Sequence, residues 1–206
     1  MRSLALFLLA VSTLNAATQV VALPGKSPLV TFRFVFRTGS AFDPPGKEGV
    51  AALTASMIAG GGTRSKSYKQ IVDAMYPMAA SVSSQTDKEM VTFAGVTHVD
   101  NLDAYYQLFR EMLLEPGWRA DDFSRLRDDH LNILRVTLRG NNDEELGKEV
   151  LYNEIYKGHP YGHHNVGSVS SLQTLTLADL QTFYKAQFTR ANLIIGIAGG
   201  YPESFL

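Results

Sequence analysis

The chain has 206 residues, and its 19 Lys and Arg against 20 Asp and Glu give a net charge of −1. This balance excludes the strongly basic surface of a nucleic-acid-binding protein and the acidic excess of a disordered chain. The absence of cysteine excludes disulfides, cysteine nucleophiles and Cys-ligated zinc. With 45% hydrophobic residues, the length suits one domain with its own core.

The first 17 residues have the layout of a secretory signal peptide. Arg2 precedes an apolar run over residues 4–11, and small or polar residues follow as far as Ala17. The run is too short to cross a bilayer, and no later segment of the sequence is long and apolar enough to do so. We therefore predict an exported protein. Export without cysteine is compatible with a bacterial periplasm.

The rest of the chain, residues 18–206, shows a mixture of strand and helix patterns. Strands are predicted from alternating or continuous apolar residues, and helices from apolar residues at helical spacing between Gly and Pro breakers. In chain order, the predicted elements are a strand at 29–36, helices at 47–59 and 67–75, strands at 79–85 and 90–97, helices at 101–114, 121–139, 143–157 and 177–188, and a strand at 192–198. This order indicates an α+β domain with helices on one face of a sheet.

Three segments carry a family resemblance through their order and spacing. Residues 35–51 combine a strand that ends in Gly-Ser with a Gly-rich turn before a helix, residues 158–162 read Gly-His-Pro-Tyr-Gly, and a late strand ends in Gly199-Gly200. Together they resemble the N-terminal domain of the M16 metallopeptidases, the family of pitrilysin, insulinase and mitochondrial processing peptidase. The resemblance implies an M16 metallopeptidase-like fold with a mixed, mostly antiparallel sheet. It also implies a second homologous domain, so that either this domain is absent or the sequence is a fragment.

The resemblance places the family's signature, His-x-x-Glu-His, on the predicted helix 47–59. Two histidines four residues apart share a helix face and hold one zinc ion, and the Glu activates the zinc-bound water. In this chain Ala52 and Ser56 stand at the two histidine positions, and Ala55 stands at the position of the base. Alanine has no donor atom, and one hydroxyl does not hold zinc.

By the same resemblance, a third zinc ligand, a Glu, belongs near residues 132–135. These read Asn-Ile-Leu-Arg, and the nearest carboxylates, Asp128 and Asp129, come one helical turn too early. The two histidines, the base and the third ligand of the family's zinc site are therefore all absent from their expected positions. We therefore expect no catalytic residue, no metal ligand and no cofactor; zinc would be expected only if the ligands lie elsewhere.

A histidine cluster at His159, His163 and His164 offers a second place for a metal. Pro160 and Gly162 interrupt the helical geometry that would align His159 with His163. The segment therefore favours a rigid turn with exposed histidines over a metal site.

The predicted strand at 79–85 is the candidate for peptide binding, because small side chains leave a sheet edge open to an added strand. By resemblance, M16 substrates lie along a sheet edge near this hairpin. The alternative interpretation is an ordinary paired strand. The candidate peptide-binding residues are Ala80, Ser81, Val82, Ser83 and Ser84.

The sequence leaves three hypotheses for function. The first is a non-catalytic M16 homologue that pairs, as in a heterodimer, with an active M16 zinc peptidase and contributes to its chamber for peptides or unfolded polypeptides. The second is an active zinc-dependent M16 endopeptidase whose ligands lie elsewhere or come from another chain. The third is a stand-alone peptide-binding module that uses the sheet edge.

Overall fold

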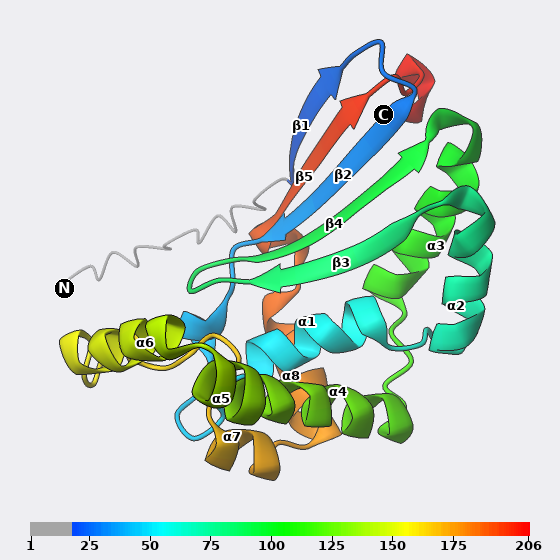
Figure 1. Ribbon diagram of the computed structural model, residues 1–206. Coiled ribbons are helices and arrows are strands. Elements are labelled where there is room, and N and C mark those ends of the chain that lie inside the picture. Colours follow the sequence, from blue (N-terminus) through cyan, green and yellow to red (C-terminus); the bar gives the residue numbers. More distant parts are fainter. Residues whose placement is uncertain (1–17) are drawn as a thin grey trace, which may run out of the picture.

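The computed structural model describes residues 18–206, and the predicted signal peptide lies outside the described residues. Its centre is a five-stranded sheet with the order β1-β5-β2-β4-β3 (Figure 1). The strands are β1 (Gln19–Pro24), β2 (Leu29–Phe36), β3 (Ser81–Thr86), β4 (Val91–His98) and β5 (Leu193–Gly199). Only β1 and β5 pair in parallel among these strands, and the other three pairings are antiparallel. The mixed, mostly antiparallel sheet of the α+β prediction is therefore confirmed.

Strand β2 forms the middle of the sheet, and its alternating pattern gives it one buried face. Val30, Phe32, Phe34 and Phe36 are buried, whereas the residues between them are more exposed. Ring contacts hold the buried face together, such as that between Phe34 and Phe109, whose ring centroids are 4.9 Å apart. This aromatic layer anchors the helical side of the sheet.

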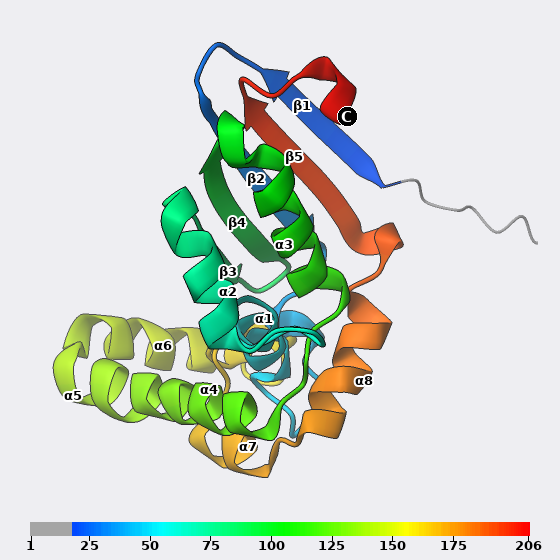
Figure 2. The same ribbon diagram turned by 90° about the vertical axis from the view of Figure 1, so that its right-hand side faces the viewer.

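The helices lie on one face of the sheet and beyond one end of its strands (Figure 2). The α-helices are α1 (Val50–Gly60), α2 (Tyr68–Met75), α3 (Leu102–Leu114), α4 (Ala120–Asn132), α5 (Arg139–Asn141), α6 (Asp143–Ile155), α7 (Val169–Thr174) and α8 (Leu177–Gln187). Helices α2 and α3 cover the sheet, while α4, α7 and α8 gather around α1 at the strand ends.

Helix α1 lies between two hydrophobic cores. Ala55 and Ile58 pack with the sheet, α2 and α3, whereas Leu53 and Met57 pack with α4, α7 and α8. The helix is therefore buried on almost every side, more completely than its apolar stripe predicts. Its alanine side chains are small and let neighbouring elements approach closely.

Four features differ from the predictions. Strand β1 and the short helix α7 were not predicted, and helix 47–59 begins later, at Val50. The helix predicted over 121–139 changes into a π-helix, η4 (Ile133–Leu138). The missed strand is short and mostly exposed, and it exists through its pairing with β5 rather than through its own pattern.

Within residues 18–206, every helix is too short or too polar to span a lipid bilayer.

Candidate functional site

A buried aspartate fixes the start of helix α1, where the family's zinc site would lie. The Asp43 carboxylate accepts hydrogen bonds from the Gly49 amide at 2.6 Å and the Ala51 amide at 2.9 Å. Burial raises the pKa of Asp43 to about 7, and these two amides oppose the rise. Gly49 has a positive φ of 95°, and a Cβ there would overlap the Val166 carbonyl oxygen. The turn predicted at 39–46 therefore positions α1 as the resemblance implies.

Of the residues at the signature positions of α1, Ala52 and Ala55 are buried and Ser56 is half-buried. Ala52 and Ala55 are 5% and 1% exposed. Ser56 faces α4, and its Oγ lies 2.9 Å from His130 Nε2. Burial lowers the pKa of His130 to about 4, so the imidazole is neutral near pH 7. The Ser56–His130 pair is therefore a neutral hydrogen bond between two helices, at the place where the family would put two zinc ligands.

These residues do not fit a zinc ion. Ala52 and Ala55 offer no donor atom, and the Ser56 hydroxyl is already bound to His130. The residue of α4 that hydrogen-bonds a signature position of α1 is His130, and it precedes the stretch 132–135 where the resemblance places the third ligand. Among the described residues, no group of three or more His, Asp or Glu side chains is arranged to hold a metal ion.

The two nearest carboxylates point away from α1. The side chains of Asp128 and Asp129 are 70% and 63% exposed, and each lies near an arginine of its own helix. They belong to the solvated side of α4, which is the common place for such charges. Neither side chain substitutes for the missing ligand.

The structure separates the three histidines of the turn at 159–164. His159 accepts a hydrogen bond from the Tyr161 amide and starts a 3-10 turn, Pro160–Gly162, which agrees with the predicted rigid turn. His163 Nε2 lies 4.0 Å from Asp43, whereas His164 Nε2 lies 3.9 Å from Glu149. Each histidine therefore has a different partner.

The candidate peptide-binding residues lie at the edge of the sheet. Strand β3 pairs with β4 on one side only, and Ala80 comes directly before it. Ser81 and Ser83 are exposed, while Val82 and Ser84 are half-buried. The Tyr105 hydroxyl donates to the Ser81 carbonyl at 2.8 Å and fixes one end of the strand on α3.

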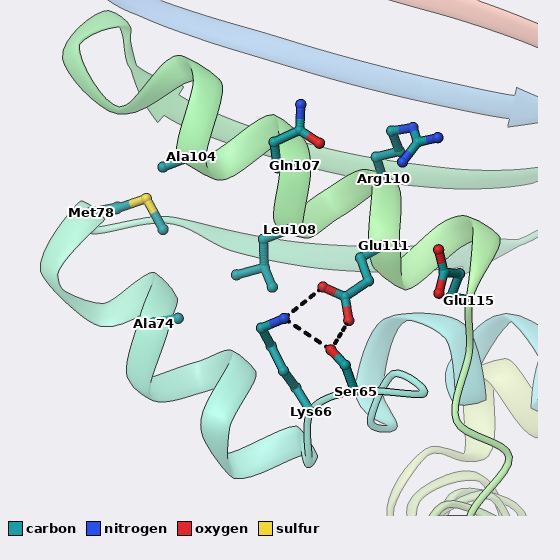
Figure 3. Close-up of a pocket in the computed structure, with 10 residues that line it drawn as sticks. All are labelled: Ser65, Lys66, Ala74, Met78, Ala104, Gln107, Leu108, Arg110, Glu111 and Glu115. Carbon is teal, nitrogen blue, oxygen red and sulfur yellow. Dashed lines mark hydrogen bonds and ion pairs between the residues drawn. The ribbon is translucent and has the colours of Figure 1, made fainter.

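A hollow of about 560 Å³ between α2 and α3 is lined by four charged side chains: Lys66, Arg110, Glu111 and Glu115 (Figure 3). Its Glu111 accepts hydrogen bonds from Thr63 Oγ1 at 2.6 Å, from Lys66 Nζ at 2.7 Å and from Ser65 Oγ. Burial by itself raises the pKa of Glu111, but these hydrogen bonds outweigh it and lower the pKa to about 2. The carboxylate is saturated by its own chain, so it ties α3 to the loop after α1 rather than binding a ligand.

We expect Glu111→Gln to reduce the free energy of unfolding by about 2 kcal/mol at pH 7, after allowance for solvent screening. A carboxyl with a lowered pKa stabilises the fold above its ordinary value of 4.5 and loses that effect as the pH falls toward 2. Urea unfolding of both proteins at pH 7 and pH 3 measures the difference. Glu115→Gln, in the same hollow, is the control, because Glu115 makes no ion pair with the described residues. An equal loss in both variants contradicts this assignment.

Fold and site together define a class: a metallopeptidase-like domain whose central helix has no metal ligands. The sequence pattern of the family described as Insulinase (Peptidase family M16) matches residues 20–168. The chain therefore belongs to peptidase family M16.

Two solved structures and one curated relative are consistent with this family membership. The peptidase M16 inactive domain from Pseudomonas fluorescens superposes with a TM-score of 0.84 and 25% identity, over 93% of this chain and 46% of that one. The periplasmic protease PqqL from Escherichia coli shares the fold with a TM-score of 0.81 and 14% identity, over 93% of this chain and 22% of that one. An uncharacterized zinc protease of Rickettsia bellii is 19% identical over 170 residues, which are 82% of this chain and 40% of the relative. This chain thus spans less than half the length of each.

Proposed function

We propose that this chain is a non-catalytic M16 subunit that pairs with an active M16 zinc peptidase and contributes to its peptide-binding chamber. The observation that carries the proposal is the α1 face, where Ala52, Ala55 and Ser56 replace two ligands and a base, and where Ser56 is bound to His130. The resemblance to a structure described as an inactive M16 domain supports it.

The edge strand β3 is our candidate for the contribution to the chamber. Its outer backbone edge has no strand partner among the described residues, and it lies next to α1. Unpaired amide and carbonyl groups accept an extended peptide by strand addition. A polypeptide held there would reach the zinc of the partner subunit rather than a metal of this chain.

Export is part of the proposal. The signal-peptide layout of residues 1–17 supports it, and one structural neighbour is described as a periplasmic protease. The mature protein would then meet its partner and its unfolded substrates in the periplasm.

We expect the purified protein to contain no stoichiometric zinc and to cleave no peptide in a chelator-sensitive manner. Elemental analysis and a hydrolysis assay on the same sample measure both. Mixing it with an active M16 chain from the same source is expected to give a complex by size-exclusion chromatography with light scattering.

Two other results would change the assignment. Stoichiometric zinc with chelator-sensitive cleavage would establish the active endopeptidase. Peptide affinity without complex formation and without metal would establish the stand-alone peptide-binding module. In either case the pairing function would be rejected.

A further inference from the structure

A second hollow, of about 450 Å³, lies among the helices that follow α4. It is bounded by the π-helix η4, by α6 and by the segment that leads into α7. None of its residues belongs to the signature positions of α1 or to β3. Its size lies within the range of pockets that bind small molecules.

The π-helix supplies one wall. Its hydrogen bonds run from residue i to residue i+5, so side chains four and five positions apart come to the same face. Leu138 of η4 and Arg139, the first residue of α5, lie four and five positions after Leu134 of η4, and all three line the hollow. π-Helical turns are rare and occur frequently at functional sites. Leu146 of α6 and Val169 of α7 add further apolar surface, and the remaining side chains are polar: His164, Ser168, Ser170 and Gln173.

The hollow has one permanent positive charge and no negative one. Arg139 is the only Lys or Arg that lines it, and no Asp or Glu does. Arg139 makes no ion pair with any residue of the range 18–206, whereas Arg125 on α4 and Lys148 on α6 both do. His164 also lines the hollow, and burial lowers the pKa of its imidazole. An unpaired guanidinium beside apolar side chains suits a ligand that has an anionic group attached to an apolar part.

We propose that this hollow binds a small apolar carboxylate, with the apolar part between Leu134, Leu138 and Val169 and the carboxylate on Arg139. A guanidinium presents parallel N–H groups that fit the two oxygens of a carboxylate. A free aliphatic acid and the last residue of a peptide with an apolar side chain share this chemistry. The inference does not depend on pairing with an active subunit.

The test uses two acids and their uncharged counterparts: octanoate with octanamide, and N-acetyl-Ala-Leu with its C-terminal amide. Isothermal titration calorimetry of the full protein measures affinity at millimolar ligand. If an acid binds, we expect its affinity to be at least tenfold higher than that of its amide. We also expect Arg139→Gln to weaken the acid at least tenfold and leave the amide unchanged.

Arg135→Gln is the matched control, because Arg135 lies on η4 about one turn before Arg139, is exposed like Arg139 and does not line the hollow. It is expected to bind like the wild type. Val169→Trp fills the hollow and is expected to abolish binding of both acids, and thermal melts establish that each variant is folded.

The two acids distinguish the sources of the carboxylate. Tighter binding of octanoate indicates a free aliphatic acid, and tighter binding of N-acetyl-Ala-Leu indicates a peptide C-terminus. Absence of binding by both acids, equal binding of acid and amide, or full affinity in Arg139→Gln would overturn the proposal.

Discussion

Replacing Gly95 by alanine is expected to lower the free energy of unfolding by about 3 kcal/mol or more. Gly95 lies on the helix-facing side of β4, opposite Phe32. A Cβ at this position would overlap the Tyr105 hydroxyl oxygen and lie 2.9 Å from the ring carbon that carries it. Tyr105 is completely buried, and its hydroxyl is held by the Ser81 carbonyl, so the ring has no free space into which to move.

Chemical denaturation followed by circular dichroism measures this loss. Gly147→Ala is the control, because a Cβ at Gly147 in helix α6 meets no atom within 4 Å. That variant is expected to gain up to about 1 kcal/mol from the higher helix propensity of alanine. Tyr105→Phe should cost only about 1 kcal/mol for the lost hydrogen bond. If Gly95→Ala lowers the free energy of unfolding no more than Tyr105→Phe does, β4 and α3 do not pack as tightly as described.

Two buried groups are expected to give the stability opposite pH dependences between pH 4 and 6.5. His130 has a pKa of about 4 in the fold against an ordinary 6.5, so the unfolded chain takes up this proton first. His130 therefore lowers the free energy of unfolding by about 3 kcal/mol as the pH falls from 6.5 to 4. Asp43 has a pKa of about 7 against 3.8, so the folded chain holds this proton first. Its stabilisation, about 4 kcal/mol, is complete below pH 3.8 and lost as the pH rises through 7.

Variants that cannot titrate separate the two effects. Relative to the wild type, His130→Gln is expected to become more stable toward pH 4, and Asp43→Asn is expected to become less stable. The wild-type curve lies between them, because the two contributions nearly cancel. Urea midpoints at half-unit pH steps measure the slopes. Slopes that change in the same direction in both variants would contradict the burial of one of these groups.

Much of the fold is predictable because its signals are local. The alternation of Phe32, Phe34 and Phe36 needs only the two-residue period of a strand, and it gives β2 with its buried face. The glycines at 60–62 end α1 close to the predicted residue. The absence of donors at Ala52 and Ala55 is also readable directly, because alanine has the same chemistry in any surroundings.

The remaining features depend on distant contacts. Nothing near Ser56 in the sequence indicates that His130 binds it. The family resemblance implies that α4 faces α1, and only packing decides which residue of α4 lies beside Ser56. The π-helix gives the same apolar pattern as an α-helix over so short a stretch. Arg139 is a candidate for ligand binding because η4, α6 and α7 together line a hollow beside it, and no local pattern in the sequence indicates that hollow.

The order of strands in the sheet has a consequence for synthesis and transport. β2 needs both β4 and β5 as neighbours, and β1 pairs only with β5, although β1 and β2 come first in the chain and β5 comes near residue 193. Such long-range pairing is slow, because loop closure must precede the contacts that reward it. A nascent chain therefore keeps β1 and the edge of β2 that faces β5 unpaired until almost all of the domain has left the ribosome. If residues 1–17 direct export as we propose, this delay keeps the polypeptide in the unfolded form that a secretion channel accepts, and folding follows on the far side of the membrane.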